Sequence, residues 1–283
     1  LVGKVIPKMK EKSAQEMSSL FPMLQKGGHY SPKECQPKEN TAIIIPFRNR
    51  NSHLHILLLN ILPLMIKQKV KFTVFVIEQV LPGAFNRAML FNIGFLEAQK
   101  IDNFDCFIFH DVDLIPINEL NFYHCNYRPT HFLSGVDKFK YKLMYNNMFG
   151  GVVAFTSKQF QRINGASNLY FGWGGEDDDL QKRITQKGFT VQRKYKTIGL
   201  YDMIKHKRDE TNHVNPLRRE LLRAATERQD IEGLNTTRYS TQSVELLPLY
   251  TWLKVSINVT EVLMTAPRFM ERLRDKLLKH FSL

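Results

Sequence analysis

The chain has 283 residues, 43% of them hydrophobic and 11% aromatic, which excludes a disordered chain and allows one large domain or two small ones. The net charge of +13 indicates an anionic partner, such as a nucleic acid, an acidic membrane surface, a sulfated glycan or a nucleotide diphosphate. No helix-turn-helix, zinc-finger or RNP-type motif is present, so no nucleic acid is expected among the partners.

Cysteine usage and the ends of the chain bear on the compartment. No apolar run approaches the ~18 residues of a membrane span, and the chain begins with Leu. We therefore expect a trimmed piece of a longer protein whose membrane anchor lies upstream. Cys106 and Cys125 could form a disulfide, and Cys35 would then have no partner cysteine in this sequence. The sequons at Asn235 and Asn258 fit the lumen of the secretory pathway.

The first half of the chain alternates strand and helix patterns. Residues 1–40 are Lys-rich and are expected to form an arm that leads into the domain. Residues 41–45 read as a strand that Pro46 ends. An amphipathic helix follows through residues 54–64, and Pro63 should kink or end it.

The same alternation continues into the middle of the chain. Residues 72–77 read as a second strand, residues 85–100 as a helix, and residues 106–109 as a strand buried on both faces. This β-α-β-α-β order predicts the α/β class, with a mainly parallel central sheet flanked by helices.

Two carboxylates, Asp111 and Asp113, follow the third of these strands. In an extended chain both side chains point the same way, and Val112 points back toward the core. Ligands of open α/β sheets bind at the carboxyl ends of the strands. The pair therefore suits a divalent cation and the phosphates that it carries, although a solvated loop or a helix cap has the same pattern.

A second acidic motif lies further along the chain. Residues 150–155 read as a strand entered through glycines, and residues 172–179 lead into a helix over residues 180–188. Acids in a first helical turn are favoured by the helix dipole, which is a purely structural explanation. Trp173 between glycines suits a lid over a ligand, and three adjacent carboxylates leave one free to act as a base.

The last part of the chain adds soft metal ligands. Met203 and His206 are three residues apart and, with Asp113, make a set that favours a transition ion such as Mn²⁺ over Mg²⁺. Residues 206–225 are highly charged, as in a mobile loop, and residues 251–257 read as a closing strand. From Arg268 onward a basic amphipathic helix either packs on the domain or touches a membrane, of which the former is expected.

Several motifs, taken in order, resemble the animal β-1,4-galactosyltransferase family. They are Pro46-Phe-Arg-Asn-Arg50, Phe85-Asn-Arg87, His110-Asp-Val-Asp113, Phe149-Gly-Gly151, the eight residues Gly172 to Asp179, and Met203-x-x-His206. The likeness runs from about residue 27 to residue 257. It implies a GT-A nucleotide-sugar-binding fold and an inverting, Mn²⁺-dependent transfer of galactose from UDP-Gal to O4 of a terminal GlcNAc on a glycoprotein or glycolipid.

The resemblance also implies roles for individual residues. Asp177 would be the catalytic base, with Glu176 and Trp173 beside it, and Asp113, Met203 and His206 would bind Mn²⁺. The cysteines Cys106 and Cys125 would form a disulfide. The UDP-sugar would contact Pro46, Phe47, Arg48, Arg50, Phe85, Arg87, Asp111, Val112, Lys138 and Gly151. The acceptor and the transferred sugar would contact Tyr145, Met148, Trp173, Asp177, Asp178 and Arg218.

Two positions depart from the family pattern. Met148 stands where many members have Tyr, so UDP-GalNAc is the alternative donor and the alternative activity is β-1,4-N-acetylgalactosaminyl transfer. Arg219 stands where an aromatic residue usually helps to form the acceptor's N-acetyl pocket. A second alternative is an inactive protein of the same fold that binds carbohydrate or heparin.

The resemblance implies an organisation of the whole chain. Residues 1–40 would be a stem, residues 41–260 the catalytic domain and residues 261–283 a basic amphipathic tail. Family members are type II single-pass proteins with the catalytic domain in the Golgi lumen, and a homodimer is a candidate assembly.

Overall fold

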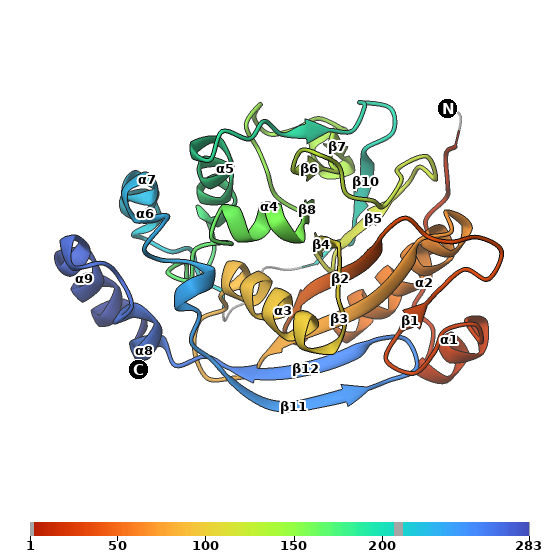
Figure 1. The fold of residues 1–283 in the computed structure, drawn as a ribbon, viewed down its shortest axis with the longest axis horizontal. Helices are drawn as coiled ribbons and strands as arrows, with labels where there is room; N and C mark the ends of the chain where they lie inside the picture. The colour runs from red at the N-terminus through yellow and green to blue at the C-terminus, as the bar shows by residue number, and fades with distance from the viewer. Residues whose placement is uncertain (1–2, 207–211, 283) are drawn as a thin grey trace.

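The computed structural model describes residues 3–206 and 212–282. Its main sheet has the strand order β11-β12-β3-β2-β4-β8-β6-β9, with β1 paired to β3, and a smaller sheet has the order β5-β10-β7 (Figure 1). The strands are β1 His29–Tyr30, β2 Asn40–Phe47, β3 Lys71–Gln79, β4 Cys106–His110, β5 Leu114–Pro116, β6 Thr130–His131, β7 Gly135–Val136, β8 Val152–Thr156, β9 Gln192–Arg193, β10 Leu200–Met203, β11 Ser240–Leu246 and β12 Thr251–Ser256. The helices are α1 Ala14–Leu20, α2 Asn51–Lys67, α3 Arg87–Ile101, α4 Ser157–Arg162, α5 Glu176–Gln186, α6 Arg218–Arg223, α7 Ala225–Arg228, α8 Val259–Leu263 and α9 Glu271–Phe281. Short 3-10 turns lie at η1 Asp137–Phe139, η2 Leu234–Thr236 and η3 Arg268–Met270.

The centre of the main sheet is parallel, as the strand and helix order predicts. Strand β2 pairs in parallel with β3 on one side and β4 on the other, and β12 pairs in parallel with β3. Every residue of β2 and β4 is buried, because α2 and α3 cover opposite faces of the sheet. The carboxyl ends of β2 and β4 therefore lie side by side at one edge.

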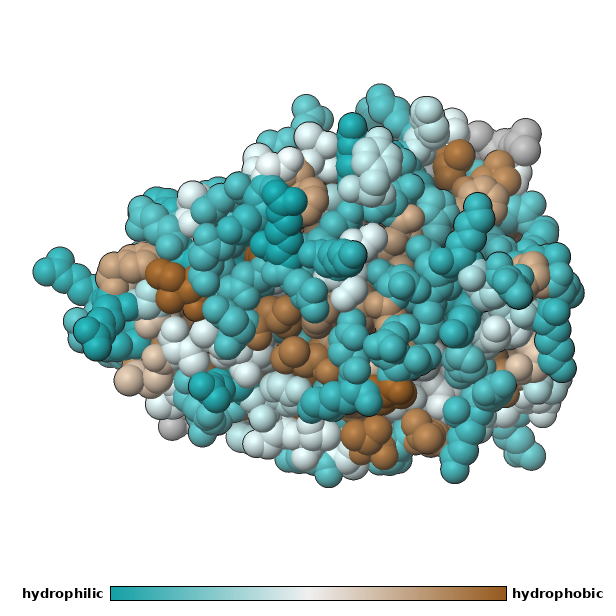
Figure 2. All heavy atoms as spheres, in the orientation of Figure 1, coloured by the Kyte–Doolittle hydropathy of each residue, from teal (hydrophilic) through white to brown (hydrophobic). Residues whose placement is uncertain are grey.

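Alternating residues of each central strand feed two separate cores. On one face Ile44 and Phe107 pack with α3, α4 and α5, and on the other Ile43 and Ile108 pack with α1 and α2 (Figure 1). The period of two side chains along a strand accounts for this division. The face of the molecule seen in Figure 2 is mostly hydrophilic, and apolar side chains form small groups on it.

Two prolines do not end the elements in which they lie. Strand β2 continues through Pro46, which pairs in register with Ile77 of β3. The register with β4 stops at Ile44, so beyond it β2 has β3 alone as a neighbour and the missing N–H of Pro46 leaves no ladder bond unmade there. Helix α2 continues past Pro63 to Lys67, with Ile61, Leu62 and Met65 buried around it. Their burial offsets the ~3 kcal/mol that proline costs inside a helix.

The outer strands depart most from the pattern that the sequence predicts. Strand β8 runs antiparallel to β4, and β12 lies inside the sheet, because β11 pairs with its outer side. The side chains of β11 are mostly exposed, so the strand carries no apolar run that marks it in the sequence. Residues 218–223 form α6, whereas a mobile loop was expected across residues 206–225; residues 207–211 lie outside the described residues.

Both terminal regions pack on the domain. Met17 of α1 and Leu277 of α9 are fully buried, and the ring of Phe281 lies 6.0 Å from that of Phe171. The expected packing of the C-terminal helix is thus confirmed. Cys106 and Cys125 form the predicted disulfide, and Cys35 is exposed with a free thiol. In the described part of the chain, no helix combines the length and the apolar character that crossing a membrane requires.

Candidate functional site

A cleft of about 260 Å³ lies where the carboxyl ends of β2 and β4 meet the N-terminus of α5. Helix α3 begins beside it at Arg87, and His206 follows β10. Most of the predicted site residues come together here. The cleft is lined by Pro46, Arg48, Arg50, His53, Phe85, Arg87, Asp111, Val112, Asp113, Gly172, Trp173, Glu176, Asp177, His206 and Asn212.

One arginine and three carboxylates form the floor of the cleft. Arg87 Nε donates to Asp111 Oδ1 at 2.6 Å, and Arg87 Nη1 donates to Asp177 Oδ1 at 2.7 Å and lies 3.8 Å from Glu176 Oε1. The guanidinium also lies over the ring of Phe91, 4.7 Å from its centroid. Arg87 is therefore bound to the acidic residues, although the resemblance assigns it to the nucleotide.

These contacts set the protonation of the floor. Burial raises the pKa of Asp111 to about 7 against the opposing pull of Arg87, and repulsion from Asp113 and Asp177 adds to the rise. Burial and the neighbouring Asp177 likewise raise the pKa of Glu176 to about 7. Burial disfavours the charged form of Arg87, yet Asp111 and Asp177 raise its pKa, so it stays a cation. The floor can therefore hold or release a proton near neutral pH.

Helix α5 brings the acidic motif into the cleft. It begins at Glu176, and Glu176 to Asp179 all lie in its first turn, where the helix dipole favours negative charge. Gly175 precedes the helix with a φ of 94°, which favours glycine. A Cβ atom on Gly150 would lie 2.0 Å from Asp177 Oδ2, so only glycine lets the loop before β8 approach this carboxylate.

Asp113 and His206 line one wall of the cleft, and β10 brings Met203 beside Leu114 without placing it in the lining. Asp113 Oδ2 lies 2.9 Å from His206 Nε2, and Met203 pairs in register with Leu114, the residue after Asp113. The main chain is fixed there, because Ile204 N donates to Asp113 O and Met203 N donates to Asp137 Oδ1, both at 2.8 Å. Among residues 3–206 and 212–282, no three His, Cys, Asp or Glu side chains form a metal site by themselves. The thioether and a ligand's own oxygens would have to complete one.

The wall beneath β2 holds the arginines of the first motif. Arg48 Nη1 donates to Gly83 O at 2.8 Å, and its guanidinium lies 5.0 Å from the ring centroid of Phe85. Arg50 precedes the first turn of α2. Phe47 is buried in the core against Trp252 and does not line the cleft. Val112 packs against the core, as the alternation along the chain predicts, and it also lines the cleft.

Trp173 lies at the mouth of the cleft and is 50% exposed. The segment around it is tied to two other parts of the chain by three main-chain bonds. Gly172 N donates to Phe85 O at 2.8 Å, Trp173 N donates to His213 O at 2.8 Å, and Asn215 N donates to Trp173 O at 3.0 Å. The position of Trp173 is thus coupled to residues 213–215, which follow the segment that the structure leaves undescribed.

The remaining predicted residues surround the cleft without lining it. Tyr145 Oη donates to Asp178 Oδ1 at 2.7 Å, and the half-buried Met148 stands two residues before Gly150. Gly151 O accepts from Asp111 N at 2.9 Å, and Lys138 is exposed on η1. The side chain of Arg218 packs on Gly174, where a Cβ atom would lie 2.9 Å from Arg218 Cδ.

Two supporting residues have roles that the sequence does not predict, although His110 belongs to the motif His110-Asp-Val-Asp113. His110 is buried below the acidic loop, with Nδ1 2.8 Å from Asp111 O and Nε2 3.0 Å from Tyr123 Oη. Since a carbonyl only accepts, Nδ1 carries the proton, and burial lowers the pKa of His110 to about 4. Arg193 donates to Asn146 O at 2.9 Å and to Met148 O at 2.7 Å, so it holds the loop that leads to Gly150. Both residues act through tertiary contacts with distant segments.

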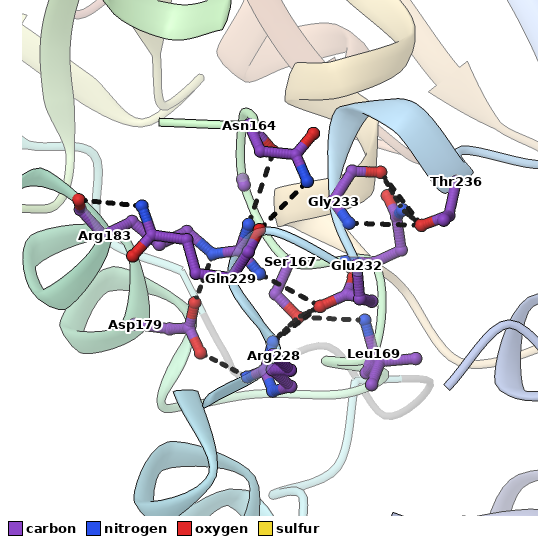
Figure 3. A network of polar contacts seen from close by, with 12 residues as sticks. Asn164, Ser167, Leu169, Asp179, Arg183, Arg228, Gln229, Glu232, Gly233 and Thr236 are labelled. Carbon is purple, nitrogen blue, oxygen red and sulfur yellow. Dashed lines mark hydrogen bonds and ion pairs between the residues drawn. The ribbon is translucent and has the colours of Figure 1, made fainter. Parts of the chain in front are cut away.

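A buried ionic network supports α5 from behind (Figure 3). Arg183 donates to Asp179 at 2.8 Å and to Glu232 at 3.0 Å, and Arg228 bonds to the same two carboxylates. All four side chains have no exposed surface. Asp179 therefore anchors the first turn of α5 in the interior, while Glu176 and Asp177 face the cleft.

Comparison with known proteins agrees with this arrangement. A family model described as the N-terminal region of glycosyl transferase group 7 matches residues 1–126, and one described as the N-terminal domain of galactosyltransferase matches residues 130–207. A β-N-acetyl-D-glucosaminide β-1,4-N-acetylglucosaminyl-transferase of Lymnaea stagnalis is 43% identical over 94% of this chain and 65% of its own length. The β-1,4-galactosyltransferase 5 of Danio rerio is 44% identical over 90% of this chain and 68% of its own length.

Solved structures show the same fold. Drosophila β-1,4-galactosyltransferase 7, in a mutant complex with manganese, UDP-Gal and xylobiose, superposes with a TM-score of 0.66 and 29% identity. The match covers 77% of this chain and 94% of that one, and it confirms the GT-A fold. The chain spans less than two thirds of the length of the snail protein and of pig β-1,4-galactosyltransferase 5. The family models and the relatives together show that this chain belongs to the β-1,4-galactosyltransferase family of glycosyl transferase group 7.

Proposed function

We propose that the protein is an inverting β-1,4-hexosyltransferase that moves galactose from UDP-Gal to O4 of a terminal GlcNAc. The observation that carries this proposal is one cleft that holds Asp177 in its floor and the Asp113–His206 pair in one wall. A transferase needs a base for the acceptor hydroxyl and a separate centre for the diphosphate, and this cleft offers both.

The residues present suit Mn²⁺. Asp113, Met203 and His206 offer an oxygen, a sulfur and a nitrogen donor, and a thioether favours a transition ion over Mg²⁺. These three residues would hold the ion together with the diphosphate. When bound, Mn²⁺ supplies positive charge that stabilises the leaving UDP.

The chain's own groups account for the rest of the proposed reaction. Arg48 and Arg50 lie where they can donate to the diphosphate, and Phe85 offers a ring to the uridine. Asp177 accepts the proton of the acceptor hydroxyl while that oxygen attacks the anomeric carbon and the bond to the diphosphate breaks. Arg87 orients Asp177 through the 2.7 Å bond. A single displacement converts an α-linked donor into a β-linked product.

The second candidate is a donor with a 2-acetamido group, UDP-GalNAc. Met148 offers no hydroxyl to a donor sugar, and a flexible thioether can make room for an acetamido group. The snail relative, whose name gives it N-acetylglucosaminyl transfer, adds UDP-GlcNAc to the donors that need testing. Galactose remains the first proposal, because relatives from five vertebrate species are galactosyltransferases by name.

The Golgi lumen is the compartment that we propose for the protein. The Cys106–Cys125 disulfide is of a kind that persists in oxidising compartments and is rare in the cytosol. An anchor upstream of this segment would fit that location.

The direct test measures UDP release from UDP-Gal, UDP-GalNAc and UDP-GlcNAc, with free GlcNAc as acceptor and Mn²⁺ present. We expect turnover that depends on the acceptor and stops with EDTA, and the fastest turnover with UDP-Gal. Failure to release UDP from any donor, while GlcNAc still binds in calorimetry, would support the inactive carbohydrate-binding alternative.

A further inference from the structure

A basic groove lies beside the mouth of the cleft, between α6 and α9. It has a volume of about 340 Å³ and is lined by Pro216, Leu217, Lys276, Lys279 and His280. The helices α6 to α9 gather at one end of the molecule (Figure 1). Lys276 Nζ bonds to Glu220 Oε2 at 3.1 Å, so the two helices are joined across the groove. This ion pair links the two sides of the groove.

The charges in this groove and along α6 are not balanced: Lys279 lines the groove, and Arg219 and Arg223 lie on α6 beyond its lining. Glu220 pairs with Lys276, but among residues 3–206 and 212–282 no carboxylate lies within ion-pair distance of Arg219, Arg223 or Lys279. All three are exposed. Arg219 and Arg223 are four residues apart on α6, a spacing at which like charges repel and destabilise a helix. Arg223 and Lys279 lie in the last turns of α6 and α9, where the helix dipole favours cations, but Arg219 lies in the first turn of α6, where it does not. Stability of the free protein thus gives no reason for Arg219.

The groove adjoins the part of the cleft that the proposed reaction gives to the acceptor. Asn215 N donates to Trp173 O at 3.0 Å, and Pro216 and Leu217 of the groove follow directly. Arg218, between the groove and the motif, packs on Gly174. A glycan whose end lies against Trp173 can therefore extend toward Arg219 and Lys279.

We infer that this groove, formed by residues 216–223 of α6 and its lead-in and by α9, binds an anionic group on the acceptor glycan, such as a carboxylate, sulfate or phosphate. The inference rests on the proposed function and gives the acceptor a chemical class. Charge complementarity carries it: Lys279 lines the groove, Arg219 and Arg223 follow the groove residue Leu217 along α6, and ammonium and guanidinium groups bind such anions by charge-assisted hydrogen bonds.

An acidic membrane surface is the competing occupant, and the packing of α9 argues against it. A helix that binds in a membrane interface turns an apolar face outward. In α9 the apolar side chains face the domain: Leu277 is fully buried, and Leu273, Leu278 and Phe281 pack against the core. The exposed face of α9 carries the cations, which suits a soluble anion.

The test compares two acceptors that differ in one charge, p-nitrophenyl and p-carboxyphenyl β-N-acetylglucosaminide. We expect the charged acceptor to have a KM about tenfold lower in 50 mM salt, and this preference to shrink in 500 mM salt. In the double variant Arg219→Gln, Lys279→Gln the ratio of the two KM values should fall to about one. The KM for the UDP-sugar should not change.

A matched control removes two exposed cations elsewhere, with Arg128→Gln and Lys196→Gln, and should keep the preference for the charged acceptor. Equal KM values for both acceptors in the wild-type protein would overturn the inference and leave the transferase intact. Absence of turnover with either acceptor would instead contradict the proposed function. Binding to phosphatidylserine vesicles that the double variant abolishes, with no acceptor preference, would assign the groove to a membrane and also overturn the inference.

Discussion

Arg87 Nη1 donates to Asp177 Oδ1 at 2.7 Å, and the same guanidinium bonds Asp111 at 2.6 Å. One cation from the start of α3 thus joins the end of β4 to the first turn of α5. Its charge offsets the mutual repulsion of the three carboxylates, which would otherwise raise the pKa of Asp111 and Glu176 further. The proposed base is therefore oriented by a residue that lies 90 positions away in the sequence.

Glu176 should make the free protein less stable as the pH rises. Burial, and repulsion from Asp177, raise its pKa from 4.5 to about 7, so the folded protein holds a proton that the unfolded chain releases above about pH 4.5. Stability from this proton is present at low pH and is lost as the pH rises through 7. The variant Glu176→Gln removes the titration.

Urea unfolding in EDTA measures this effect. At pH 8 we expect Glu176→Gln to unfold with a free energy about 1–3 kcal/mol larger than that of the wild-type protein, and at pH 5 with almost the same free energy. An equal difference at both pH values would show that the side chain acts through packing and not through its charge.

His206 should be required for Mn²⁺ binding. Loss of an outer-shell partner usually weakens metal affinity about 10- to 100-fold, and loss of a direct ligand should cost no less. We expect His206→Asn to weaken Mn²⁺ binding in the presence of UDP by at least about tenfold, measured by the loss of the free Mn²⁺ signal in electron paramagnetic resonance.

The matched control for this experiment is His55→Asn. His55 lies on α2 and bonds to Glu11 at 2.9 Å, and it does not line the cleft. Its substitution should leave Mn²⁺ affinity as it is. Equal affinities in the wild-type protein and in His206→Asn would remove His206 from the metal site.

Arg228 should be important for stability. It joins Asp179 and Glu232, all without exposed surface, and its loss leaves two buried carboxylates with Arg183 alone (Figure 3). Breaking a buried pair usually costs about 3–5 kcal/mol. We expect Arg228→Met to lower the free energy of unfolding by that amount in urea, whereas Arg274→Met, which breaks an ion pair with exposed acids, should cost about 1 kcal/mol or less. Similar losses for both variants would contradict a special role for the network.

Met148 should decide how the donor is chosen. Arg193 donates to the carbonyl oxygen of Met148. Gly150, two residues further on, lies close to the carboxylate of Asp177. A Tyr at position 148 brings a ring and a hydroxyl in place of a flexible chain, and both would oppose a 2-acetamido group. We expect Met148→Tyr to lower kcat/KM for UDP-GalNAc relative to UDP-Gal by about tenfold or more. An unchanged ratio of the two values would place donor selection elsewhere.

Local patterns are enough to predict the centre of the fold and most of the cleft. The buried strands, the Asp-x-Asp motif and the resemblance predict that Asp111, Asp113, Asp177 and His206 lie near one another, and all four line one cleft. The partners of Arg87 could not be predicted, because they depend on how α3 and α5 meet. Strand β11 and the roles of His110 and Arg193 could not be predicted either, because each depends on contacts with a distant segment.

Asp177→Asn tests the central claim most directly, because the amide keeps the shape of the side chain and cannot take a proton. We predict that kcat falls by about 10²–10⁴-fold, while Mn²⁺ binding and the affinity for UDP in calorimetry stay within about twofold of the wild-type values. Transfer at close to the wild-type rate by Asp177→Asn would contradict the assignment of this carboxylate as the base.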